Sequence, residues 1–328
     1  MRMFDLPYNG DDPKVFLERM EPYKEHIDAV FCSLPNTRHH LKSSKGVEYL
    51  EQCKHFLRES EGKVTRAVTL NTMYDVLNND DMALEFYHIR NDIEEYRPDV
   101  CIISDFHVAQ MVRNEFPDMK IDTSSNCFQY NIAEMKQWDK VIGIHYFNPP
   151  RQAARSMDML KLMHSHGFKL KVLVNEKCFF GCPQMINHCI QLSAGSIRKD
   201  PCFLWEPENL FKGCWLLPRW LEKLDPYVAV WKIQGREASS DVLFKALDVY
   251  VNSAECYIHD LTWIDHQEFD IEHLEVPTDA IPDKLLTCKM EECDTCGVCK
   301  GLAEKFLKPA MMQSKNIAFG HGFSFGEQ

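Results

Sequence analysis

Short apolar or β-branched runs alternate along this chain with longer segments whose apolar residues recur every three or four positions. The short runs predict strands, the longer segments predict amphipathic helices, and their alternation predicts βα units joined in a parallel sheet. Eight runs have the length of strands: Met3–Pro7, Asp28–Leu34, Val64–Leu70, Val100–Ser104, Lys120–Thr123, Lys140–Tyr146, Leu170–Asn175 and Val228–Ile233. The helical pattern occupies segments between them, such as Val15–Lys24, Val47–Glu59, Met82–Tyr96 and Gln152–His166.

Eight strands that are each followed by a helix would close a (β/α)8 TIM-like barrel, and we expect this α/β fold for residues 1–254. An open, doubly wound sheet is the alternative. The segment 179–227 contains several Pro and Cys residues, which favours an insertion over the barrel mouth ahead of the last strand and the helix Asp241–Val251. Residues 255–328 then form a C-terminal extension with a cysteine motif of its own.

Polar residues end several of the predicted strands. Examples are Ser104-Asp105, Thr123–Asn126, His145–Asn148 and Asn175-Glu176. The active sites of barrels are built at the carboxyl ends of the strands, so these residues together predict a polar pocket. Each of them alone is equally well explained as a turn or cap residue.

The charge balance limits the classes of partner. Among 328 residues, 49 are acidic and 37 are basic, and a net charge of −12 argues against general affinity for nucleic-acid backbones. A local basic patch for RNA is compatible with it. The sequence shows neither a secretory signal nor an apolar run long enough to cross a membrane, so we expect a cytoplasmic protein without a membrane partner.

Fourteen cysteines in a chain without an export signal indicate reduced thiols and metal ligands rather than disulfides. Four of them lie within the twelve residues CKMEECDTCGVC, with two gaps of two residues that suit a single metal centre. This spacing fits a zinc ion and an iron-sulfur cluster equally well. The predicted metal ligands are Cys288, Cys293, Cys296 and Cys299.

A second group of cysteines follows the predicted strand Leu170–Asn175, where thiolates would reach the catalytic face of a barrel. Its first two members are separated by three residues, as in radical-SAM enzymes, but the third follows after six residues and does not fit that motif. Buried cysteines without a ligand are the alternative. The group comprises Cys178, Cys182, Cys189, Cys202 and Cys214, whereas Cys32, Cys53, Cys101, Cys127 and Cys256 are expected to be core residues.

Several motifs resemble the U-thirty-two peptidase-like family, the collagenase-like peptidases. They are PDVCIISDFHVAQMVRNEFPDMKIDTSSN, then HYFNPPRQ with Asn148 and Arg151, and KIQGRE with Lys232 and Arg236. A less-studied branch of the family is similar in NEKCFFGCP, which holds Glu176 and Cys178, and in CDTCGVCKGLAEK. Gln234 departs from the strand motif of the family, and the six-residue gap between Cys182 and Cys189 leaves the ligand set ambiguous.

The resemblance implies a 4Fe-4S cluster, one or two in number, with zinc as the alternative at the C-terminal site. It further implies an oxidoreductase that hydroxylates an RNA base or a small aromatic or quinone-type substrate without oxygen. Arg151, Lys232 and Arg236 would then bind an anionic group, and His145 and His188 would be acid-base groups or ligands. Solvated charges and ordinary hydrogen-bonded histidines are the alternatives for these residues.

Two other functions stay open at this point. The chain could be a non-catalytic, cluster-carrying subunit that works with a related barrel or with an electron donor. A peptidase is the less favoured reading, because neither a G-x-S-x-G nor an H-E-x-x-H motif occurs in the sequence.

Overall fold

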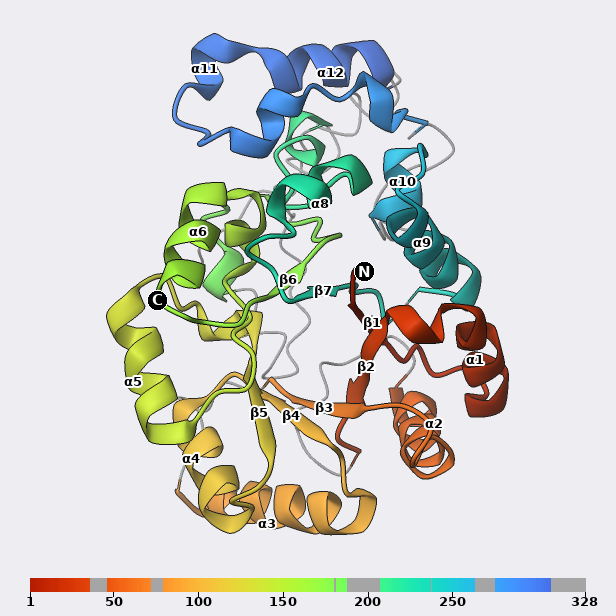
Figure 1. Cartoon of the computed structure of the whole chain (residues 1–328), viewed down its shortest axis with the longest axis vertical. Coiled ribbons are helices and arrows are strands. Elements are labelled where there is room, and N and C mark those ends of the chain that lie inside the picture. The colour runs from red at the N-terminus through yellow and green to blue at the C-terminus, as the bar shows by residue number, and fades with distance from the viewer. Residues whose placement is uncertain are drawn as a thin grey trace, which may run out of the picture.

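The computed structural model describes residues 1–35, 46–71, 79–179, 181–187, 207–236, 238–262 and 275–307. Seven parallel strands form one sheet in the order β5-β4-β3-β2-β1-β7-β6. Figure 1 shows them curled into a TIM-like barrel with helices on the outside. The strands are β1 (Phe4–Pro7), β2 (Ile27–Ser33), β3 (Arg66–Leu70), β4 (Val100–Ile103), β5 (Lys120–Thr123), β6 (Lys171–Leu173) and β7 (Val230–Lys232).

Several helices begin at a polar residue whose side chain caps the amino end of the helix. Side chains of Asp12, Asp105, Asn131 and Ser239 accept the first backbone N–H groups of α1, α4, α5 and α9. The predicted helices are confirmed with small shifts of their ends. The helices are α1 (Pro13–Met20), α2 (Gly46–Glu59), α3 (Asn79–Tyr96), α4 (Phe106–Glu115), α5 (Ile132–Ile142), α6 (Met157–Ser165), α8 (Pro218–Leu224), α9 (Ser240–Asn252), α10 (Ile258–Leu261), α11 (Cys293–Cys296) and α12 (Val298–Phe306).

The predicted strand Lys140–Tyr146 is wrong in its first half, because α5 continues to Ile142. Gly143, at a φ of 71°, ends this helix in the left-handed conformation that glycine adopts without strain. The extended residues after it bond to both edges of the sheet. His145 N donates to Ile121 O, Thr123 N donates to Tyr146 O, and Phe147 pairs in parallel with Leu170. This short segment therefore joins β5 to β6 in the place of the predicted sixth strand.

The alternation of side chains divides the barrel from its helical shell. Phe4 and Leu6 belong to the large apolar core, whereas Asp5 between them is fully buried on the opposite side of β1. A second, small apolar cluster holds only Ala29, Phe31, Ala67, Val100 and Ile102, from β2, β3 and β4. The remaining interior positions include charged side chains, which is unusual for a core and directs attention to them.

Residues 275–307 contain no strand and pack on the chain that precedes β7. Arg219 and Trp220 of α8 bond to Asp283, and Arg219 also donates to the carbonyls of Thr278 and Ile281. Figure 1 shows α11 and α12 together at one end of the molecule. Within the described ranges, no helix has the length and apolar character needed to cross a membrane.

Candidate functional site

An ion pair at the carboxyl end of β6 organises the barrel mouth. Glu176 follows β6 and is 1% exposed, and its Oε2 lies 3.0 Å from Nη1 of Arg151 in the 3-10 turn Arg151–Arg155. Nη2 of Arg151 donates to Asn126 Oδ1 at 3.0 Å. The N–H of Cys178 donates to Glu176 Oε1 at 2.9 Å. Burial acts to raise the pKa of Glu176, but Arg151 and the Cys178 N–H outweigh it and lower that pKa, so the carboxylate is ionised.

Cys214 is brought to the same place by the chain that precedes α8. Phe179 and Gly213 pair antiparallel, and Cys214 N donates to Cys178 O at 3.0 Å, so the two cysteines lie opposite each other. Burial raises the pKa of Cys214 to about 12, and the negative charge of Glu176 acts in the same direction. Without a bound cation this thiol is therefore protonated.

The other predicted mouth ligands are only partly accounted for. Cys182 is half-buried in the turn after Phe179, and its carbonyl accepts from Met185 N. Cys189, Cys202 and His188 lie outside the described residues. The structure thus brings Cys178 and Cys214 together with Glu176, and the ligand set proposed for the mouth stays a prediction.

Two cations at the end of β7 form no ion pair with a carboxylate in the described part of the chain. Lys232 is 8% exposed, and its ammonium lies 4.3 Å from the centre of the Phe31 ring, with neither an ion pair nor a hydrogen bond. Burial lowers the pKa of Lys232 to about 8. Arg236 donates to the hydroxyls of Ser33 at 2.8 Å and Thr69 at 3.3 Å. Both cations could therefore receive an anionic ligand.

Two asparagines after strand ends add acceptors to the mouth. Asn148 is fixed by Thr123, which accepts from its backbone N–H at 2.9 Å and from its Nδ2 at 2.6 Å. The Oδ1 atoms of Asn148 and Asn71 are buried and have no hydrogen-bond partner among the residues that the structure describes. Buried acceptors are rarely left unpaired, which favours a bound ligand or water at these atoms.

His145 does not lie at the mouth, and its predicted placement was wrong. Because the extended segment begins after Gly143, this residue sits near its amino end, with Nδ1 3.1 Å from Asp122 Oδ1. Asp122 Oδ2 in turn lies 2.9 Å from Nζ of Lys171, the first residue of β6. The Lys171 ammonium is also 2.7 Å from Asp5 Oδ2 and 3.5 Å from Asp28 Oδ2. His145 thus belongs to an ionic network at the opposite end of the barrel.

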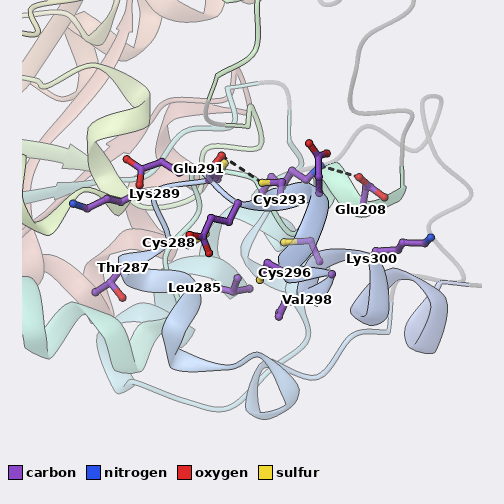
Figure 2. A pocket seen from close by; sticks show the side chains of 16 residues that line it. Glu208, Leu285, Thr287, Cys288, Lys289, Glu291, Cys293, Cys296, Val298 and Lys300 are labelled. Carbon is purple, nitrogen blue, oxygen red and sulfur yellow. Dashed lines mark hydrogen bonds and ion pairs between the residues drawn. The ribbon is translucent and has the colours of Figure 1, made fainter.

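The C-terminal cysteines line one cavity of about 450 Å³. Figure 2 shows Cys288, Cys293 and Cys296 around this hollow, and Cys299 lines it too. Cys293 and Cys296 are the ends of α11, and the left-handed turn at Gly297 leads into α12. In the described ranges, no three His, Cys, Asp or Glu side chains are close enough to form a ready metal site. The four thiols therefore share a cavity but would have to turn inward to coordinate one centre.

Known proteins share this fold and part of this sequence. The family model described as peptidase family U32 matches residues 18–179. The uncharacterized protease MJ1657 of Methanocaldococcus jannaschii is 22% identical over 227 residues, which cover 64% of this chain and 67% of that protein. The solved structure of the U32 peptidase Mk0906 superposes with a TM-score of 0.55 at 9% identity, over 72% of this chain and 93% of that one.

The chain belongs to peptidase family U32. The match ends at residue 179, so it includes Glu176 and Cys178 of this U32 protein but neither Cys214 nor the C-terminal cysteines. The family resemblance seen in the sequence is confirmed, whereas most members of the two cysteine groups lie beyond the matched residues.

Sequence reasoning missed several buried ionic residues. Asp5, Asp122 and Lys171 each interrupt an apolar strand at an interior position, and charged residues in such runs were the available signal. Arg155 carried no comparable signal, because it follows the family motif by only a few residues and reads as part of a helix.

Proposed function

We propose that this U32 protein is an iron-sulfur-dependent redox enzyme whose substrate binds in the barrel mouth. The observation that carries the proposal is the shared cavity of Cys288, Cys293, Cys296 and Cys299, since four thiols of one short segment around one hollow are hard to explain by packing. Tetrathiolate coordination is the usual ligand set of 4Fe-4S clusters, and zinc is the alternative occupant. A cluster bound there would supply single-electron transfer.

The mouth supplies the binding groups. Lys232 and Arg236 would hold an anionic group of the substrate or of its oxygen donor, because neither is neutralised by a described carboxylate. Arg151 is not equally available, since Glu176 already compensates its charge. The Oδ1 atoms of Asn71 and Asn148 would accept hydrogen bonds from the substrate. Hydroxylation of an RNA base or of a small aromatic or quinone-type compound follows from the family resemblance.

The mouth cysteines are a second metal site in this proposal. Cys178 and Cys214 already face each other across a backbone hydrogen bond, and Cys182 follows in the next turn. Cys189 and Cys202 would complete the set. The Glu176 carboxylate beside these thiols would then be a positioning group that holds the Cys178 backbone.

A cluster-carrying subunit without its own chemistry is the second candidate. Cys293 and Cys296 are exposed, so a centre at this site would lie near the surface, where an electron donor or a related barrel could reach it. This placement suits an electron relay as well as an enzyme.

Anaerobic purification with iron, sulfide and zinc analysis tests the proposal. The wild-type chain should contain iron and sulfide and absorb broadly in the visible range. The double variant Cys293→Ala/Cys296→Ala should lose about four irons per chain. Cys178→Ala/Cys182→Ala should lose a similar amount if the mouth holds a second cluster. Cys256→Ala, a half-buried cysteine outside both groups, is the matched control.

Three outcomes separate the readings. Zinc without iron would contradict the redox proposal while keeping a metal at the C-terminal site. Equal iron in all variants would contradict both ligand assignments. Iron in the chain with turnover only after a partner barrel is added would favour the subunit over the enzyme.

A further inference from the structure

Arg155 is a buried arginine at the junction of the barrel, the chain before α8 and the C-terminal region. The residue is 4% exposed and ends the 3-10 turn that also carries Arg151. Its guanidinium lies 5.6 Å from the Trp215 ring centre and 5.9 Å from that of Trp220. The two aromatic rings exclude water from the guanidinium, but their attraction for its charge is weak.

Among the described residues, the hydrogen-bond acceptors of Arg155 are all backbone carbonyls. Nε and Nη2 donate to Leu285 O, the former at 3.1 Å, and Nη1 donates to Phe211 O at 3.0 Å and Gly213 O at 2.6 Å. Gly213 precedes Cys214, and Leu285 O also accepts from Cys288 N at 3.4 Å. Arg155 is therefore connected through the backbone to one cysteine of each group.

The charge of Arg155 is not compensated by a carboxylate. No described Asp or Glu forms an ion pair with it, although buried cations are normally paired because their desolvation is unfavourable. Burial lowers the pKa of Arg155, and the groups that act in the opposite direction are the thiols of Cys214, Cys299 and Cys288. Leu285, whose carbonyl accepts hydrogen bonds from Arg155, lines the same cavity as Cys288 and Cys299, so thiolates formed there on metal binding would lie near this cation.

We propose that Arg155 is the charge-compensating residue of the C-terminal metal centre, stabilising the ligand thiolates of Cys288 and Cys299. The inference rests on the proposed binding of a tetrathiolate centre in this cavity. Four thiolates around Zn²⁺ or around an oxidised 4Fe-4S cluster leave a net charge of about −2. A fixed buried cation nearby favours that charge, so it strengthens metal binding and raises the reduction potential of a cluster.

Three variants separate electrostatics from structural support. Arg155→Met removes the charge and keeps the length, and Arg155→Lys restores the charge without the fork of donors. Arg219→Met is the matched control, because Arg219 also stacks on Trp220 and bonds to the carbonyls of Thr278 and Ile281, but its partner is Asp283. Each chain is purified without metal and titrated with Co²⁺, whose thiolate charge-transfer absorbance reports coordination, and then with Zn²⁺ in competition.

We expect Arg155→Met to weaken Zn²⁺ binding about tenfold or more, the range usual for losing an outer partner of a metal site. Arg155→Lys should recover part of this loss, and Arg219→Met should bind as the wild type does. In iron-loaded protein, only Arg155→Met should have a more negative reduction potential.

Different results would contradict the role of Arg155, the C-terminal metal centre and the redox proposal. If Arg155→Met and Arg219→Met bind Zn²⁺ equally well and share one potential, Arg155 is a structural clamp and the inference is wrong. If the wild-type chain shows no thiolate charge-transfer band with Co²⁺ and does not bind Zn²⁺, the C-terminal centre and this inference are both wrong. If the Zn²⁺ affinities of the variants follow the expected order but the protein never takes up iron, only the redox proposal is overturned.

Discussion

Two buried lysines of the described barrel interior have opposite surroundings. At the amino end, the Lys171 ammonium lies within 3.5 Å of Asp5, Asp28 and Asp122. At the carboxyl end, Lys232 has a ring face beside it and no described ion pair, although the charge of Asp5 on the neighbouring strand attracts it. Burial acts to lower both pKa values, yet the carboxylates hold the pKa of Lys171 above its ordinary range, whereas that of Lys232 falls to about 8.

This difference indicates that Lys171 has a structural role, whereas Lys232 is available to bind a ligand. The amino-end network has its charges balanced within the protein, and its geometry leaves Lys171 fully buried. The carboxyl end holds a cation that forms no described ion pair and whose burial Asp5 and Asp122 offset only in part, as expected of a binding group at the active face of a barrel.

The largest expected effect is at the paired lysine. Lys171→Met leaves Asp5 and Asp122 buried without their cation, so the free energy of unfolding should fall by about 3–5 kcal/mol. Urea denaturation at pH 7 measures it, with the exposed Lys169→Met as the control. If Lys171→Met lowers the free energy of unfolding by less than about 1 kcal/mol, the network does not have the structural role assigned to it.

The same substitution at Lys232 should act in the opposite direction. Lys232→Met removes a buried charge that forms no described ion pair and is only partly offset by Asp5, so it should raise the free energy of unfolding by about 1–2 kcal/mol at pH 7, while weakening the binding of anionic ligands. A loss of stability comparable to that of Lys171→Met would show that Lys232 is paired in solution and would end the comparison.

The pH dependence of stability sharpens this prediction. The folded pKa of Lys232 is about 8, below its unfolded value of about 10.4, so between them the unfolded chain binds more protons. Wild-type stability should therefore gain a contribution as the pH rises from about 8 to 10. Lys232→Met should lack that gain, which parallel urea titrations at three pH values would reveal.

The smallest effect is expected at the edge of the amino-end network. The Asp28 side chain is 27% exposed and lies 3.5 Å from the Lys171 ammonium, farther than its two fully buried partners. Asp28→Asn should change the free energy of unfolding by less than about 1 kcal/mol. It should also lower the pKa of Asp5, now raised to about 6 chiefly by burial and further by Asp28. A loss as large as that of Lys171→Met would mean that the network acts as one unit.

Most of the fold could be predicted from the sequence because periodicity reports which side chains are buried. Seven of the eight predicted strands occur, and the remaining one, Lys140–Tyr146, is displaced because α5 covers its first three residues before Gly143 ends the helix. That shift also moved His145 to the wrong end of the barrel. The partners of Arg155 could not be predicted, since its acceptors come from residues 56 to 130 positions away.

The order of the strands has a consequence for how the chain is made. β2 to β5 each pair with the strand that precedes them in the chain, so this part of the sheet can assemble as it leaves the ribosome. The other edge of β1 must wait for β7, because Asp5 pairs with Lys232. At about 5–20 residues per second, roughly ten to forty-five seconds of synthesis separate the two. During that time an unpaired parallel edge is exposed, and such edges recruit other chains. Nascent chains that stall before β7 should therefore be the species most in need of a chaperone.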